Sequence, residues 1–157
     1  MKTLIDNFQV VALAFSSEEM LDASVITPLD ILEAEDRYIC PVVGEPLADR
    51  LLEGAYPELL NDYVAPALAA WVRYVVQPML PRRTAAQLVE DGDGGAVTEP
   101  LNCREVYMQK LLRRKASTLL YRLGEYLDAN ADKYPEYNPD NNALNRCTIN
   151  GSIIQIY

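Results

Sequence analysis

Apolar side chains recur at helical spacing along most of this chain, and the clearest stretch follows Tyr56. Apolar residues, among them the single tryptophan Trp71, return there every three or four positions, which is the spacing of one face of an α-helix. We therefore predict a long, almost wholly buried helix that ends at Pro78 and Pro81. Pro66 lies in its middle, so we expect a kink or the start of a second segment there.

Start and stop signals predict three shorter helices before this one. Ser16 and Glu19 form the S-x-x-E pattern of a capping box. Thr27 followed by proline is typical of an N-cap and the first helical residue, whereas Pro41 cannot continue that helix. Gly54 is a stop signal for the third helix. The three expected helices span residues 17–25, 28–39 and 45–53.

The second half of the chain combines one long helix with two irregular regions. Asn102 and Glu105 predict the start of the longest helix, which reaches about residue 131. Its expected core stripe comprises Val106, Leu112, Ala116, Leu119, Leu123 and Leu127. The glycine-rich residues 82–101 predict a flexible or hairpin insertion. Residues 138–157 predict a loop followed by a terminal hairpin around Asn150-Gly151.

Together these elements define the predicted fold class. A length of 157 residues suits one domain, and a hydrophobic content of 50% suits a globular chain. We predict one helical domain over residues 1–157 that is mainly α, a small bundle of about five helices. A short β-hairpin insertion and a C-terminal β-hairpin complete it.

The residue types argue against most enzyme classes. The chain contains no histidine, which removes Ser-His-Asp and Cys-His catalysis and histidine metal ligands. Its three cysteines are far apart, which favours free thiols over a disulfide framework or a zinc site. We therefore expect no catalytic residue, no cofactor, no metal site and no small-molecule substrate.

Two acidic groupings and one mixed pair are candidate sites. Asp91 and Asp93 lie in a glycine-rich stretch, but the spacing of an EF-hand loop fails, which leaves a plain turn. The carboxylates of Glu33, Glu35 and Asp36 are more simply a solvated helix face than a magnesium site. An enzyme would need a pocket lined by groups such as Glu35 and Lys115, and we rank that reading last.

Charge is distributed unevenly along the chain. Residues 1–62 carry 13 acidic and 3 basic side chains, a balance of −10, whereas residues 63–157 carry 10 and 11, a balance of +1. This asymmetry suits head-to-tail association between copies. The basic positions we assign to such an oligomer interface are Lys110, Arg113 and Arg114, and the acidic ones are Glu33 and Asp36. A solvated outer face, or contact with DNA phosphate, remains an alternative for the basic positions.

Tyrosine is the commonest aromatic residue, with 10 copies against 2 phenylalanines. This bias is typical of interfaces, where the ring is buried and the hydroxyl stays hydrated. Tyr134, Tyr137 and Tyr157 lie in the polar tail, so we expect them outside the core.

One family shares this order of elements. The chain runs from a Thr27-Pro28 helix through the turn Cys40-Pro41-Val42-Val43-Gly44 to a Glu45-Pro46-Leu47 helix and the Val64-to-Pro78 segment. A glycine-rich excursion and a long helix ending near Tyr134-Pro135 follow. This order resembles small head–tail connector proteins (adaptor or head-completion proteins) of tailed bacteriophages, especially those of Bacteroidetes prophages. The resemblance covers about residues 20–137.

The resemblance implies a structural role and particular partners. Such proteins assemble as a ring below the portal, extend the DNA channel and contact the next neck protein; DNA passes through without specific binding. It implies synthesis in the cytoplasm and a final place in the virion neck, with no membrane contact. The alternative is a small cytosolic bacterial protein-interaction or regulatory module. An acidic first third without a basic DNA clamp departs from a DNA-binding pattern and leaves open which face lines a channel.

Overall fold

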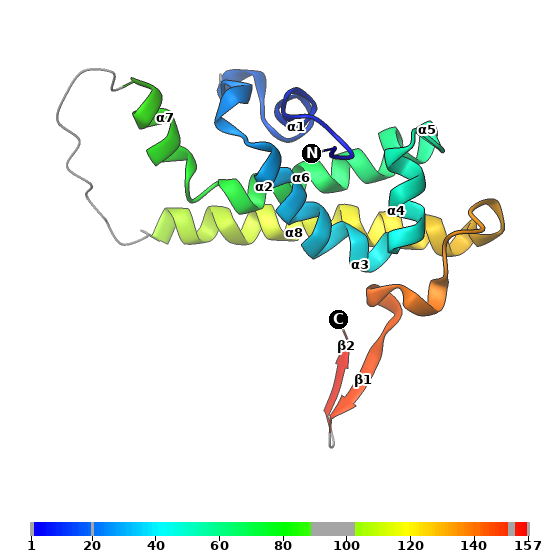
Figure 1. The fold of residues 1–157 in the computed structure, drawn as a ribbon. Coiled ribbons are helices and arrows are strands. Elements are labelled where there is room, and N and C mark those ends of the chain that lie inside the picture. The colour runs from blue at the N-terminus through cyan, green and yellow to red at the C-terminus, as the bar shows by residue number, and fades with distance from the viewer. Residues whose placement is uncertain (1, 20, 89–102, 151–152, 157) are drawn as a thin grey trace.

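The computed structural model describes residues 2–19, 21–88, 103–150 and 153–156. The described chain is mainly helical, as predicted, with two short strands near its C-terminal end. The α-helices are α1 (Asn7–Ala14), α2 (Pro28–Ala34), α3 (Cys40–Val43), α4 (Glu45–Leu52), α5 (Pro57–Leu59), α6 (Ala65–Val76), α7 (Leu80–Leu88) and α8 (Cys103–Ala129). Figure 1 shows α6 and α8 running along one another as the body of the bundle.

Helix α6 is the centre of the core, as its apolar pattern predicts. It packs against α8, α1 and α2. Eight of its side chains are buried, and Leu68 and Val72 are fully so. Trp71 is 5% exposed and stacks on Tyr38 at 3.8 Å between ring centroids. Burial of a large apolar side chain contributes about 1.5–3 kcal/mol. The packing of α6 against its neighbours is therefore the main stabilising feature of the bundle.

Two π turns carry helices through prolines. The first (Glu35–Ile39) joins α2 to α3, and the second (Leu60–Val64) joins α5 to α6. After each turn a backbone N–H donates to the carbonyl five residues earlier. A proline lacks this N–H and clashes with the carbonyl four residues back in a regular α-helix. The wider π turn relieves that clash, so the expectation that the helix over residues 28–39 ends before Pro41 is wrong.

The N-terminal region differs from its prediction. Asp6 caps α1 through a reciprocal capping box with Gln9. This helix was not predicted from the sequence. The continuous helix expected over residues 17–25 is wrong, because two separate 3₁₀ turns, η1 (Ser17–Glu19) and η2 (Ala23–Val25), occupy it. The Ser16 N–H still donates to the Glu19 carboxylate at 2.7 Å. A local cap therefore formed without a helix to extend it.

The insertion also begins differently. Residues 82–88 belong to α7, which starts with Leu80 and Pro81, so Pro81 opens a helix and does not end one. The hairpin expected between Leu88-Val89 and Ala96-Val97 lies outside the described residues. Near the C-terminus, β1 (Cys147–Asn150) pairs antiparallel with β2 (Ile153–Ile156), with Cys147 opposite Ile156.

The segment after α8 folds back onto the bundle through three 3₁₀ turns: η5 (Ala131–Lys133), η6 (Pro139–Asn141) and η7 (Ala143–Asn145). Tyr134 and Tyr137 are each only 6% exposed, which corrects the expectation that they lie outside the core. Tyr137 accepts a hydrogen bond from the buried Asn142 amide at 2.8 Å. Tyr157 lies outside the described residues. Of the expected α8 stripe, Val106 is 41% exposed.

Candidate interaction surfaces

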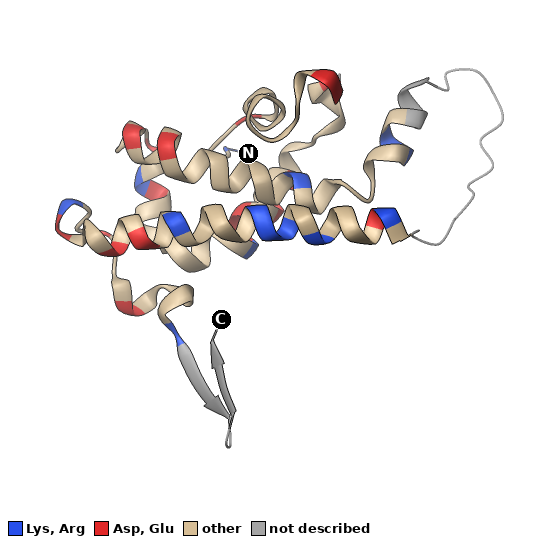
Figure 2. Ribbon diagram, turned by 180° about the vertical axis from the view of Figure 1, so that it is seen from behind, with Lys and Arg blue, Asp and Glu red and all other residues tan. Residues whose placement is uncertain are grey.

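The predicted basic residues gather on one face of α8. Lys110, Arg113 and Arg114 are exposed, and together with Ser117, Thr118 and Tyr121 they line a shallow hollow of about 450 Å³. We call these six residues the basic face. Positions three and four apart lie on the same side of a helix, which is why the spacing of the cations already indicated a patch. Figure 2 shows basic positions following one another along α8.

The two acidic residues predicted as its counterpart do not share one surface. Glu33 lies 3.7 Å from Arg37 and lines a hollow with Tyr38 and Tyr74. Asp36 lines a different hollow, formed by the N-terminal segment, the first π turn and α4. The structure therefore places Glu33 and Asp36 in different hollows, and Glu33 is paired with Arg37 four residues along the chain.

The hollow that contains Asp36 has a volume of about 500 Å³. Its walls carry four carboxylates and one lysine, and we call it the acidic hollow. It is lined by Lys2, Leu4, Leu32, Glu35, Asp36, Cys40, Glu45, Ala48, Asp49 and Leu52. The lysine ammonium donates to the Leu52 carbonyl. This surface combines residues far apart in sequence, which no local pattern could have brought together.

Glu35 is the buried member of the acidic hollow. It is 5% exposed, and its Oε1 accepts a hydrogen bond from the Leu4 N–H at 2.8 Å. Burial raises the pKa of Glu35 to about 7, against the lowering effect of that hydrogen bond, and the charge of Asp36 raises it further. The sequence signal was present, because Glu35 shares a helix face with the apolar Leu32 and Ile39.

The described residues give no support to three kinds of chemistry in this hollow. Burial, followed by the nearby carboxylates, raises the pKa of the Cys40 thiol to about 11, so it stays protonated and is a poor nucleophile near neutral pH. Lys115 does not line the hollow that contains Glu35, so the structure does not bring this pair together. Among the described residues, no group of three or more His, Cys, Asp or Glu side chains is arranged to hold a metal ion.

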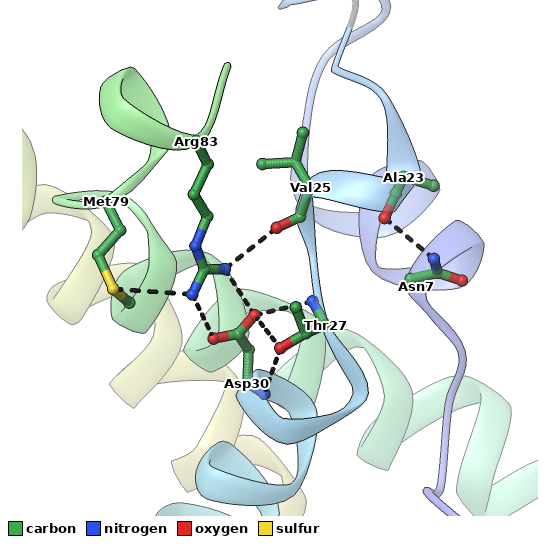
Figure 3. A network of polar contacts seen from close by, with 7 residues as sticks. All are labelled: Asn7, Ala23, Val25, Thr27, Asp30, Met79 and Arg83. Carbon is green, nitrogen blue, oxygen red and sulfur yellow. Dashed lines mark hydrogen bonds and ion pairs between the residues drawn. The ribbon is translucent and has the colours of Figure 1, made fainter. Parts of the chain in front are cut away.

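A third polar cluster joins α7 to the start of α2 (Figure 3). Arg83 forms a two-pronged ion pair with Asp30, with Nη1–Oδ2 at 2.6 Å and Nη2–Oδ1 at 2.9 Å, and it also donates to the Val25 carbonyl at 3.1 Å. The same carboxylate accepts from the Thr27 N–H, completing the predicted helix cap. Asp30, the third residue of the helix that Thr27 caps, is only 6% exposed.

The electrostatics of this cluster explain its role. Burial acts to raise the pKa of Asp30, but hydrogen bonds from Arg83 and Thr27 hold it below its ordinary value. A charge-assisted pair of this geometry is specific in orientation. It fixes where α7 leaves the bundle, and so it fixes the start of the chain that leads toward α8.

Comparison with known proteins adds one match. A family model described as "Family of unknown function (DUF6712)" matches residues 102–146. The match covers α8 and the 3₁₀ turns that fold back onto it, and therefore includes the basic face but not the acidic hollow. Neither the curated proteins nor the solved structures give a match.

Within the described ranges, no helix has the length and apolar character needed to cross a membrane.

Proposed function

We propose that this chain is a structural assembly protein whose copies associate head to tail into a closed ring. The observation that carries the proposal is the presence of two surfaces of opposite charge, the basic face and the acidic hollow, at separate places on one small bundle. Because the two surfaces differ, contact between them is heterologous, and a heterologous contact that closes on itself makes a ring.

The resemblance to phage head–tail connectors suggests which partners such a ring would contact. The partners would be the portal and neck proteins, and DNA would pass through the ring without specific binding. A net charge of −9 supports the absence of specific DNA binding, because affinity for phosphates needs a net basic surface. The paired strands β1 and β2 leave outer edges that can add to a neighbour, so we propose the C-terminal hairpin as a second subunit or neck contact. We propose a contact with the portal or a neighbouring copy for the 82–101 excursion.

The alternative is a monomeric or dimeric protein-interaction module of the bacterial cytosol. It would use the same surfaces for unrelated partners. Phage structural genes beside the gene for this chain would favour the connector, and their absence would favour the module.

The mass of the purified protein tests the proposal directly. Light scattering at 50 mM and 1 M NaCl, over a wide concentration range, should give one discrete oligomer that dissociates more readily at high salt. The reason is that the Debye length falls from about 14 Å at 50 mM to about 3 Å at 1 M salt. A monomer under every condition would contradict spontaneous ring formation.

A further inference from the structure

We infer that the basic face of one copy seats in the acidic hollow of the next copy. This rests on the proposed head-to-tail assembly and deepens it by naming both halves of the contact. It replaces Glu33, one of the two acidic positions expected from the sequence, with residues of α4.

The first argument is that both surfaces gather charges that have no ion-pair partner among the described residues. Asp36, Glu45 and Asp49 form no ion pair with another residue of the described ranges, and neither do Lys110, Arg113 and Arg114. The acidic hollow brings together four carboxylates, and the basic face brings together three cations. The two surfaces are therefore complementary in charge.

The second argument is position. The basic face and the acidic hollow share no lining residue. Helix α8 lies behind α2, α3 and α4 in Figure 1 and in front of them in Figure 2. Within the described ranges no ion pair joins the two surfaces, so contact between them would come from a second molecule.

The third argument comes from Glu35. Its Oε1 accepts from the Leu4 N–H at 2.8 Å, and the residue lines the acidic hollow. A carboxylate that is 5% exposed pays a desolvation cost unless a cation meets it. A guanidinium entering the hollow would supply that cation, and Arg is suited to two-pronged contact with carboxylates.

The acidic hollow favours a second copy over nucleic acid as the partner. A net charge of −9 repels phosphate and another copy alike at long range, so the choice depends on local complementarity. Another copy presents carboxylates in a concave site of about 500 Å³, where the long stems of lysine and arginine can be buried while their heads are paired.

Charge reversal on each side tests the contact. The first variant combines Arg113→Glu with Arg114→Glu, and the second combines Glu45→Lys with Asp49→Lys. Each should raise the dissociation constant of the oligomer at least about tenfold, the scale of close interfacial charge pairs. A 1:1 mixture of the two variants should assemble again, because each reversed surface then meets an opposite one. The variant with all four changes should also assemble by itself.

Matched controls reverse exposed charges elsewhere on the bundle. Asp62→Lys with Asp132→Lys changes net charge as the second variant does, and Arg82→Glu with Lys133→Glu changes it as the first does. Both controls should assemble like the parent chain. Far-UV circular dichroism and thermal unfolding check the folding of every variant, and co-assembly of the mixture itself requires two folded partners.

The outcomes separate this inference from the proposed ring. If the parent chain assembles and the two reversed variants assemble equally well, the ring stands and the inference is wrong. If the variants dissociate and their mixture stays dissociated, the inference is also wrong. If the parent and the mixture are monomeric at all concentrations, both the ring and this contact are overturned. Binding of labelled duplex DNA that is lost on Arg113→Glu with Arg114→Glu, without assembly, would assign the basic face to nucleic acid.

Discussion

Replacing Glu35 by glutamine should stabilise the protein at alkaline pH and change little at acidic pH. The carboxylate of Glu35 is 5% exposed, and its pKa is raised from 4.5 to about 7, mainly by burial. Glutamine retains an oxygen that can accept the Leu4 N–H but carries no charge. The substitution therefore removes the ionisation of one buried group and preserves its shape and its hydrogen bond.

The sign and size follow from proton linkage. Between pH 4.5 and about 7 the folded chain keeps the Glu35 proton that the unfolded chain has released. Because the folded state then binds more protons, the stability of the parent chain falls as the pH rises through this window. At 1.36 kcal/mol for each unit of pKa, the full difference is about 3 kcal/mol. The variant should lack this fall.

Urea unfolding of both proteins at pH values from 4.5 to 8, followed by circular dichroism, measures the effect. The difference in unfolding free energy should be near zero at pH 4.5 and grow in favour of Glu35→Gln to about 3 kcal/mol at pH 8. Groups that titrate alike in both proteins cancel in this difference. Glu33→Gln, an exposed neighbour on the same helix, should show no such growth. Parallel pH profiles for the parent and Glu35→Gln would refute the reasoning.

Two further substitutions test other contacts. Arg83→Leu leaves the buried Asp30 carboxylate without its ion-pair partner and should lower the free energy of unfolding in urea at pH 7 by about 3 kcal/mol. The control Arg82→Leu, at an exposed neighbour, should lower it by less than about 0.5 kcal/mol. Equal losses would contradict a structural ion pair. Gly124→Ala places a Cβ 2.8 Å from Leu144 Cδ1, the end of a side chain that must shift, so part of the helix gain of about 1 kcal/mol should be lost. In a Leu144→Ala background the same change should stabilise more in thermal unfolding, and an equal effect in both backgrounds would show that the approach is not crowded.

Capping residues and apolar periodicity in the sequence predicted α2, α4 and α6. Thr27 caps α2 as expected, because its side chain and that of Asp30 satisfy each other's backbone N–H groups. Gly54 follows α4 with a φ of +92°, a conformation that glycine adopts without strain. The α6 stripe is buried because a helix that is apolar on most sides has no solvated face.

Other features depend on tertiary contacts and were beyond local reading. Tyr134 and Tyr137 are buried because the tail returns to α8, a path that no turn residue specifies. The ion pair of Asp30 depends on Arg83, more than fifty residues away. For the candidate surfaces, the spacing of the α8 cations was visible in sequence. The acidic hollow was not, because its residues come from the N-terminal segment, α2, the first π turn, α3 and α4.

The two π turns make these helical segments intolerant of single-residue deletions. Ala34 and Ile39 are both fully buried although five residues apart, and so are Leu59 and Val64. Each turn holds one residue more than a regular α-helix needs, which keeps the residues on its two sides facing the core. Removing that residue would restore a regular α-helix and set the ring of Pro41 or Pro66 against the carbonyl four residues earlier. Relatives of this chain should therefore place insertions and deletions outside residues 34–42 and 59–66.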